Sequence, residues 1–277
     1  MKNIELHLVS DSTGETVSSI ARSVIALFEG VEPNEHIWSL VRTKGQLEKV
    51  IQGIRENPGI VLYTIIDPAM QDLIRAACRE LNVPCIDPLS RVISDVAAHL
   101  GMKMSAKAGG QHELDEDYFK RVEAINFSIS HDDGQATWDL DNADIVLVGV
   151  SRTSKSPTCV YLSYRGYRTA NVPLVKDCPL PENLLTATHP LIVGLVIAPE
   201  RLAQIRRSRL LSLNEQRDTN YVDIEYIKEE VAEARKLFQR HKWPVIDVTR
   251  KSVEETSATI IQYYQAREKG DRVTADE

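Results

Sequence analysis

A glycine, a lysine and a serine near the middle of the chain are spaced as in a phosphate-binding loop. An apolar run at 144–150 contains Gly149, and Lys155 and Ser156 follow after a short polar stretch. This is the P-loop pattern G-x-x-x-x-G-K-[ST], except that Ser154 stands at the position of the second glycine. In such a loop, backbone N–H groups and the positive end of the following helix bind a phosphate. We expect Lys155 to contact the terminal phosphates of a nucleotide and Ser156 to bind Mg²⁺.

This loop is the predicted nucleotide site, and it is basic in a chain that is acidic overall. Its charge favours an anion as the ligand. The alternative is an ordinary loop between a strand and a helix that happens to contain serine and lysine. The residues assigned to nucleotide binding are Gly149, Val150, Ser151, Arg152, Thr153, Ser154, Lys155 and Ser156.

A histidine and two carboxylates precede the strand that leads into the loop. His131, Asp132 and Asp133 are followed by Gly134. Adjacent carboxylates beside a histidine are typical of acid–base or metal chemistry, whereas the dipeptide Asp-Gly is typical of a tight turn. The position directly upstream of the loop strand keeps the first interpretation open. Together with Lys155, these residues are the predicted catalytic groups.

The first predicted strand ends in a run of hydroxyl and carboxylate side chains. Parallel sheets bind ligands at the carboxyl ends of their strands, so these side chains are candidates for phosphate or substrate contacts. The same side chains would also serve to cap the next helix, and both interpretations stay open. The candidates are Ser10, Asp11, Ser12 and Thr13.

A helix predicted from Pro199 onward is rich in arginine. Its Arg206 and Arg207 are candidates for phosphate contacts through guanidinium forks, and the alternative is a solvated basic face. Asp177 follows the strand predicted for 169–175. Because enzymes with this loop commonly place an aspartate near the metal, it is a candidate Mg²⁺ ligand beside Ser156.

Strand-like and helix-like segments alternate along the chain, which indicates parallel sheets covered by helices. The fold class is therefore α/β, with an N-terminal parallel-sheet domain at 1–101 and a C-terminal P-loop kinase-like domain at 136–277. Residues 102–135 are expected to connect the two domains and to carry the acidic motif, with a helix at 115–122 and a strand at 124–130. The other predicted strands are 4–10, 36–40, 60–66, 84–87, 144–150, 191–197 and 245–249, and the other predicted helices are 16–28, 44–56, 68–81, 89–100, 158–167, 222–239 and 252–265.

The composition is that of a soluble globular protein of two domains. The chain has 277 residues, of which 43% are hydrophobic and 26% charged, and its formal net charge of −7 disfavours a broad nucleic-acid surface. The early charges and the short apolar runs predict neither a signal peptide nor a membrane span. Four cysteines without metal-ligand spacing indicate reduced thiols and a cytoplasmic location.

Three stretches taken together resemble the pyruvate, phosphate dikinase regulatory protein family. They are residues 10–16, residues 117–125 leading to 131–134, and residues 149–158. They occur in the order of that family, and the resemblance covers nearly the whole chain. Related members of the family act on phosphoenolpyruvate synthase.

The resemblance implies a bifunctional enzyme. One activity is an ADP-dependent serine/threonine kinase that inactivates the dikinase at a threonine near its catalytic phosphohistidine. The other is a phosphorylase that removes this phosphate with inorganic phosphate and releases pyrophosphate. By resemblance, Lys155 and Ser156 would hold the ADP phosphates and any Mg²⁺, and residues 131–133 would take part in phosphate transfer, on the phosphorylase side.

Other functions fit the same residues. The target could be phosphoenolpyruvate synthase instead of the dikinase. The chain could be a P-loop kinase for a small molecule, or a regulator that senses ADP without chemistry, which the substituted glycine favours. Neither nucleic acid nor a membrane is an expected partner. The sequence does not fix the oligomeric state, and a homodimer is one option.

Overall fold

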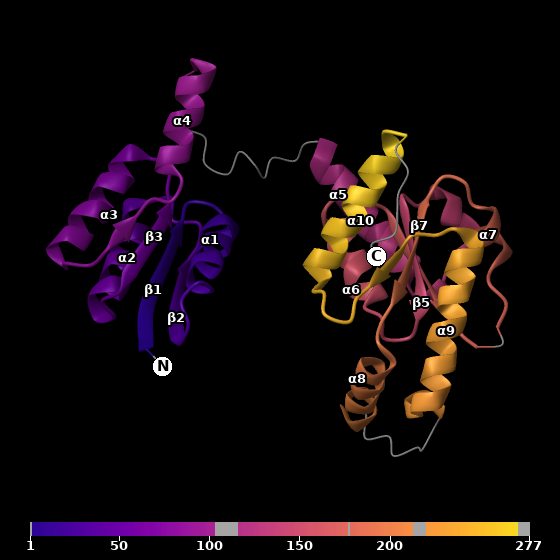
Figure 1. The fold of residues 1–277 in the computed structure, drawn as a ribbon. Helices are drawn as coiled ribbons and strands as arrows, with labels where there is room; N and C mark the ends of the chain where they lie inside the picture. Colours follow the sequence, from indigo (N-terminus) through magenta and orange to yellow (C-terminus); the bar gives the residue numbers. More distant parts are fainter. Residues whose placement is uncertain (1, 103–115, 177, 213–219, 271–277) are drawn as a thin grey trace. The chain divides into compact units, whose positions relative to one another are not determined.

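The structure is a computed structural model that describes residues 2–102, 116–176, 178–212 and 220–270. The chain divides into two compact units, residues 1–113 and residues 114–277 (Figure 1). Each unit is built on a four-stranded parallel sheet with helices packed on it, which confirms the α/β fold class. Residues 116–135 of the predicted connecting segment fold as part of the second unit, so the acidic motif is built into that unit.

In the first unit, the strand order is β2-β1-β3-β4. The N-terminal strand β1 lies inside the sheet, and its last five residues are buried. The helix α2 begins at a capping box formed by Thr43 and Gln46, which explains why it begins there. The strands are β1 (Lys2–Ser10), β2 (Val31–Trp38), β3 (Ile60–Thr64) and β4 (Cys85–Ile86), and the helices are α1 (Glu15–Ile25), α2 (Lys44–Glu56), α3 (Pro68–Glu80) and α4 (Ser90–Leu100).

In the second unit, the strand order is β6-β5-β7-β8. Every residue of β5 and of β7 is buried, as expected for interior strands of a parallel sheet that is covered on both faces. The glycine Gly194 in β7 admits the ring of Phe238, because a Cβ there would lie 2.4 Å from it. The strands are β5 (Ile145–Val150), β6 (Thr169–Leu174), β7 (Leu191–Val196) and β8 (Val245–Asp247).

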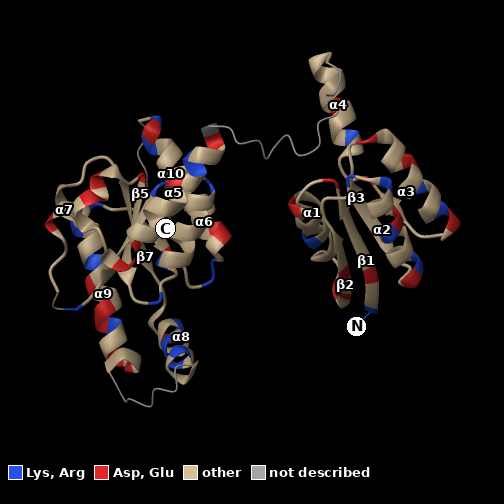
Figure 2. Ribbon diagram, turned by 180° about the vertical axis from the view of Figure 1, so that it is seen from behind, with Lys and Arg blue, Asp and Glu red and all other residues tan. Residues whose placement is uncertain are grey.

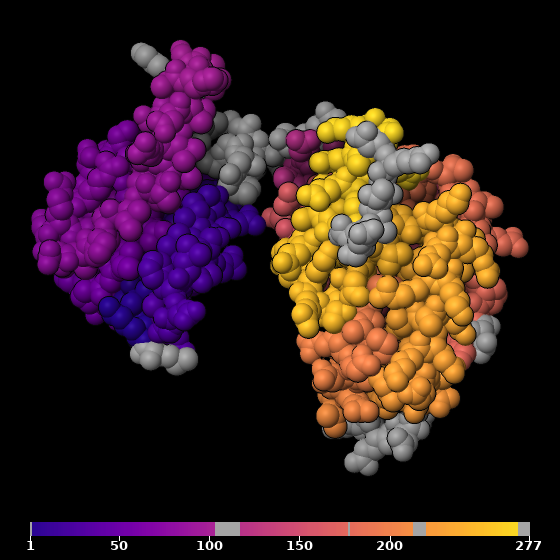
Figure 3. All heavy atoms as spheres, in the orientation of Figure 1, coloured from indigo at the N-terminus to yellow at the C-terminus, as the bar shows by residue number. Residues whose placement is uncertain are grey.

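The helices of the second unit form two groups. One group is α5, α6 and α10, which pack together, and the other includes α8 and α9, of which α9 contacts β7 and β5. Figure 3 shows α10 in yellow and α9 in orange, and Figure 2 shows, as blue stretches of the ribbon, that arginine residues recur along α8. The helices are α5 (Glu116–Ser130), α6 (Lys155–Tyr164), α7 (Glu182–Thr186), α8 (Pro199–Ser212), α9 (Ile224–His241) and α10 (Val253–Glu268), with short 3₁₀ turns η2 (Asp132–Gly134), η3 (Thr137–Asn142) and η4 (Asn220–Val222).

The strand predicted for 124–130 is wrong, because these residues belong to α5. Ala124, Ser128 and His131 are buried, and Phe127 is partly buried. This spacing of three and four residues follows one face of a helix, whereas a strand would alternate. The helix turns that face toward α6 and β6, and this places the acidic motif beside the loop.

Both sheets place a polar loop at the same topological position. From β5 the chain crosses to β6 on one side of it and then returns to β7 on the other side. Ligands bind at the carboxyl ends of parallel strands where the strand order reverses in this way. The loop after β5 is the predicted phosphate loop, and the loop after β1 has the equivalent position between β1 and β3 in the first unit. Among the described helices, none is long and apolar enough to cross a membrane.

Candidate active site

The loop after β5 has the strand–loop–helix form of a phosphate-binding loop. β5 ends at Val150, and α6 begins at Lys155. Gly149 is required by space, because a Cβ there would lie 2.7 Å from the carbonyl oxygen of Leu195 and 2.8 Å from Oγ1 of Thr153. The first glycine of the pattern therefore lets the end of β5 lie close to β7 and leaves room for the side chain of Thr153.

Ser154 has the backbone conformation that the second glycine of the pattern normally provides. Its φ is 59° and its ψ is 24°, in the left-handed region, and Arg152 also has a positive φ of 74°. The side chain of Ser154 makes no capping hydrogen bond at the start of α6. The substitution thus changes the residue without changing the turn, at the cost of placing a Cβ in a conformation that favours glycine.

The loop lysine is held inside the loop. Lys155 is 5% exposed, and its Nζ donates a hydrogen bond of 2.9 Å to the carbonyl oxygen of Val150, which also accepts from Oγ1 of Thr153. Burial lowers the pKa of Lys155 to about 8, against the opposing influence of the carboxylate of Asp133. The ammonium group is therefore short of anionic partners in the free protein, and this favours an anionic ligand.

The acidic turn η2 is joined to the start of α6 by side-chain hydrogen bonds. The hydroxyl of Ser156 donates to Oδ1 of Asp132 over 2.7 Å, and the side-chain amide of Asn171 donates to the same oxygen. Oδ1 of Asn171 in turn accepts from the backbone N–H of Asp133 at 3.1 Å. Asn171 thus fixes both aspartates relative to the loop.

Asn171 is the site residue that sequence reasoning missed. It is 1% exposed in the middle of β6, and its backbone N–H donates to the carbonyl oxygen of His131 at 3.2 Å. Because β6 pairs directly with β5, the amide lies beside the loop helix. The available signal was one amide side chain in an apolar strand, since a buried amide must find hydrogen-bond partners.

His131 lies behind the acidic turn and is 4% exposed. Its ring stacks on Phe127 with centroids 3.7 Å apart, and Nδ1 donates to the carbonyl oxygen of Phe127 at 2.8 Å. Nε2 then faces Oδ2 of Asp139 at 3.7 Å. These contacts fix the ring beneath the turn, whereas Asp133 is exposed at its surface.

A pocket of about 310 Å³ lies over the loop. Its walls bring together five of the eight predicted loop residues and one of the two predicted carboxylates. They are Asp133, Ser151, Arg152, Ser154, Lys155, Ser156, Pro157, Pro173 and Ile205. The pocket is large enough for a diphosphate group, and it offers the start of α6 and two cationic side chains to such a group.

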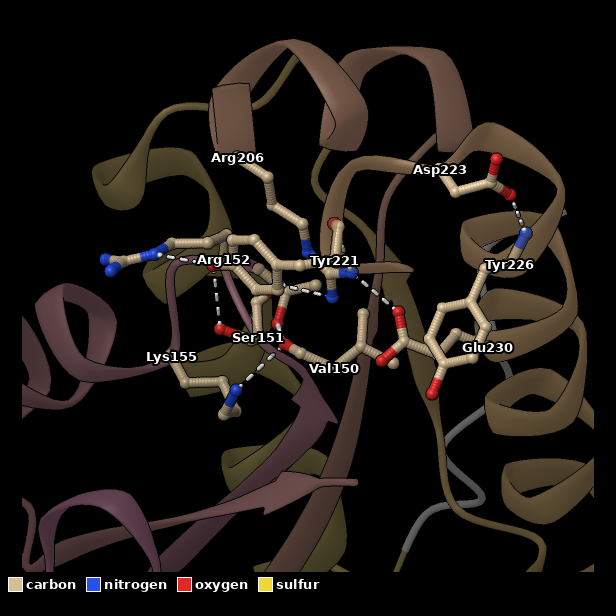
Figure 4. A network of polar contacts seen from close by, with 10 residues as sticks. Val150, Ser151, Arg152, Lys155, Arg206, Tyr221, Asp223, Tyr226 and Glu230 are labelled. Carbon is tan, nitrogen blue, oxygen red and sulfur yellow. Dashed lines mark hydrogen bonds and ion pairs between the residues drawn. The ribbon is translucent and has the colours of Figure 1, made fainter. Parts of the chain in front are cut away.

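The two predicted arginines have different surroundings. Arg206 is 1% exposed, and it donates to Oε2 of Glu230 at 2.7 Å and to the carbonyl oxygen of Ser151 at 3.2 Å (Figure 4). Arg206 therefore supports the loop through the carbonyl group of Ser151, whereas Arg207 is exposed on α8. Asp177, the predicted second Mg²⁺ ligand, lies outside the described residues.

The predicted polar loop of the first unit is closely bonded to its own sheet. Oδ2 of Asp11 accepts from the backbone N–H of Ile66 at 2.7 Å, and Oγ of Ser10 accepts from the hydroxyl of Thr64 at 3.1 Å and from the N–H of Ser12 at 3.1 Å. Thr13 accepts through its carbonyl oxygen from the hydroxyl of Ser39. The bonds to Thr64 and Ile66 join the carboxyl end of β1 to that of β3, and the bond from Ser39 joins the loop to the segment after β2.

Comparison with known proteins decides the family. The model of the family described as kinase/pyrophosphorylase matches residues 6–261. The chain belongs to the kinase/pyrophosphorylase family. Relatives provisionally named pyruvate, phosphate dikinase regulatory protein include one from Paramagnetospirillum magneticum, 53% identical over 96% of this chain and 85% of its own length. Another, from Caulobacter vibrioides, is 52% identical over 92% of this chain and 81% of its own length.

Membership of the kinase/pyrophosphorylase family confirms the resemblance seen in the sequence, and it gives the loop a phosphotransferase context. Within the described part of the chain, no group of three or more histidine, cysteine, aspartate or glutamate side chains is placed to hold a metal ion. The oxygen atoms of Ser156 and Asp132 are nevertheless of the kind that Mg²⁺ prefers, together with phosphate oxygens and water.

Proposed function

We propose that this chain is a bifunctional regulator of pyruvate, phosphate dikinase. In one reaction it transfers the β-phosphoryl group of ADP to a threonine hydroxyl of the dikinase, which yields AMP, phosphothreonine and a proton. In the other, inorganic phosphate attacks that phosphothreonine, and the products are pyrophosphate and the free threonine. The observation that carries the proposal is the hydrogen bond between Ser156 of the loop and Asp132 of the acidic turn.

The loop side of the site suits the donor of the phosphoryl group. Phosphoryl transfer depends on positioning and on neutralising charge, with little covalent chemistry for the protein to perform. Lys155, Arg152 and the start of α6 supply positive charge around the pocket. Lys155 would exchange the carbonyl oxygen of Val150 for a phosphate oxygen when ADP binds.

The acidic side of the site suits the second reactant. Asp133 lies on the wall of the same pocket, and in this proposal its carboxylate accepts a proton from a threonine hydroxyl or orients inorganic phosphate. Hydrogen bonds from Ser156 and Asn171 fix the carboxylate of Asp132, which makes it a candidate Mg²⁺ ligand. Mg²⁺ held by Ser156 and Asp132 would neutralise phosphate charge.

The names of the relatives support the dikinase as the protein substrate. Those quoted above share about half of their residues with this chain over nearly its full length, and each is named for the dikinase. A protein substrate also fits the exposed position of Asp133, because a threonine on a flexible segment can reach an exposed carboxylate. The synthase is the alternative target for the same chemistry.

The proposal is tested with β-labelled ADP and purified dikinase that carries phosphate on its catalytic histidine. We expect label on a dikinase threonine, followed by labelled pyrophosphate when inorganic phosphate is added. Lys155→Ala should abolish the transfer, and Lys236→Ala, which removes an exposed lysine of α9, should leave it unchanged. Label on the synthase alone would change the partner, and label on a small molecule alone or on nothing would overturn the proposal.

A further inference from the structure

A second pocket adjoins the loop pocket and has a volume of about 620 Å³. Ser151 lines both pockets, whereas Asp133 lines only the first. The second pocket lies between the end of β6, the turn η4 and the helix α9. Figure 4 shows three of its side chains, Tyr221, Tyr226 and Glu230. Side chains from these elements and from α8 form its walls, including Leu174, Val175, Arg206, Tyr221, Tyr226 and Glu230.

The walls of this pocket combine flat aromatic, aliphatic and carboxylate groups. The rings of Tyr221 and Tyr226 line the pocket. The ammonium nitrogen of Lys176 lies over the Tyr226 ring, 4.8 Å from its centre. Aromatic rings of this kind stack on nucleobases. Oε1 of Glu230 has no partner among the described residues, and a carboxylate oxygen is the usual acceptor for ribose hydroxyls.

Arg206 joins the second pocket to the loop. One end of its guanidinium reaches Ser151 of the loop and the other reaches Glu230, while its Cζ lies 4.5 Å from the centre of the Tyr221 ring. Its Nε is buried and has no partner among the described residues. A buried donor without a partner costs free energy, so an acceptor from a ligand or a water would stabilise this end of the pocket.

We propose that this second pocket binds the nucleoside part of ADP. The inference rests on the proposed function, and the order of the groups along the site gives its direction. The β-phosphate, which is transferred, belongs beside Asp133 in the first pocket. The α-phosphate then lies near Ser151, and the ribose and base continue past Tyr221 into the second pocket. A phosphopeptide would bring a further negative charge toward Glu230, so the uncharged nucleoside is the better match.

The test compares the binding of ADP with the binding of pyrophosphate by calorimetry, because pyrophosphate has the phosphates without the nucleoside. We expect the wild type to bind ADP more tightly than pyrophosphate. Tyr226→Ala should weaken ADP binding about tenfold, the lower range for loss of one stacked base, and leave pyrophosphate binding unchanged. Tyr226→Phe should bind ADP as the wild type does. Tyr164→Ala, which removes an exposed tyrosine at the far end of α6, is the matched control.

The outcomes separate this inference from the proposed function. Equal affinity of the wild type for ADP and pyrophosphate, with no effect of Tyr226→Ala, would overturn the nucleoside assignment and leave the loop as a phosphate site. Equal weakening of both ligands in Tyr226→Ala would also overturn it, because the ring would then act through the loop. No binding of either ligand by the wild type would overturn the proposed function together with the inference.

Discussion

The hydroxyl oxygen of Ser156 lies 2.7 Å from Oδ1 of Asp132, although the two residues are 24 positions apart in the chain. The motif assigns the first residue to Mg²⁺ binding, and the resemblance assigns the second to phosphate transfer. Their contact brings the two residues together at the start of α6, so both proposed roles would belong to one site. The predictions below follow from this site and from the loop that holds it.

Asp132→Asn keeps the shape of the side chain and removes its charge. We expect it to impair phosphate-dependent removal more than transfer from ADP, because inorganic phosphate and phosphothreonine are two separate anions that must be brought together in the site, whereas the two phosphates of ADP are already joined by a covalent bond. The rate of transfer would be measured with β-labelled ADP, and the rate of removal from the labelled pyrophosphate that is released. The control is Asp117→Asn, on the exposed surface of α5. Equal loss of both activities would indicate one shared requirement for the charge. No loss of either would return residues 131–134 to the role of a tight turn.

Lys155→Met should stabilise the free protein while abolishing transfer. The folded-state pKa of about 8 is below the ordinary value of 10.5, so the unfolded state holds more protons between these pH values. The native protein therefore gains stability as pH rises from about 8 to 10.5, and at pH 7 the buried charge costs on the order of 3 kcal/mol. Urea unfolding at pH 7 should show a higher free energy of unfolding for Lys155→Met. A lower value would contradict the burial of an unpaired charge.

The affinity for ADP should fall as the pH rises above about 8, which is the pKa of Lys155 in the free protein. Above that pH Lys155 loses the proton that gives it its charge, whereas an ordinary lysine would keep it to about pH 10. Calorimetric titrations between pH 6.5 and 9.5 (roughly one and a half units on either side of that value) would measure the change. Lys155→Arg keeps its charge over this range, so whatever affinity it retains should not change with pH. A flat profile for the wild type would show that the charge of Lys155 does not contribute to binding.

Ser154→Gly should stabilise the protein by about 1 kcal/mol, because glycine adopts the left-handed conformation without strain. No capping hydrogen bond is lost with the serine side chain. Ser208→Gly, at an exposed position inside α8, should have the opposite effect of about 0.5 kcal/mol. Thermal and urea unfolding would measure both. Destabilisation by Ser154→Gly would mean that the serine side chain supports the loop through another contact.

Asn171→Ala should lower the rate of transfer and leave the affinity for ADP nearly unchanged. The amide contacts Asp132 and the backbone of Asp133, and it does not line the pocket over the loop. Single-turnover kinetics would separate the rate from the affinity, and Asn126→Ala on the exposed surface of α5 is the control. A weaker affinity with an unchanged rate would assign Asn171 to the loop and not to the acidic turn.

Much of the fold could be predicted from the sequence, because the pattern of apolar residues is nearly continuous in the interior strands. β5 was predicted from its apolar run, and the loop after it from Gly149, Lys155 and Ser156. The prediction of a strand at 124–130 was wrong because its short apolar run also fits one face of a helix. The fold class and the phosphate loop could be predicted because each depends on a pattern of residues that are close together in the sequence.

The missed parts of the site depend on contacts between segments that are distant in the chain. Asn171 has no motif around it, and only the pairing of β6 with β5 brings it to Asp132. Arg206 and Arg207 are neighbours in a basic helix, and the sequence did not show which of them faces inward. The structure gives that place to Arg206, whose partner Glu230 comes from α9.

One amide connects three elements, since Asn171 of β6 contacts the acidic turn η2 directly and faces the hydroxyl of Ser156 in α6 at 3.4 Å. Its dipole therefore points at Asp132 before a ligand arrives. In water, such an orientation would have to be created during the reaction, at a cost in free energy. In this protein the folded strand β6 already holds Asn171 in that orientation. The reorganisation energy of the acidic turn should therefore be small in both proposed reactions.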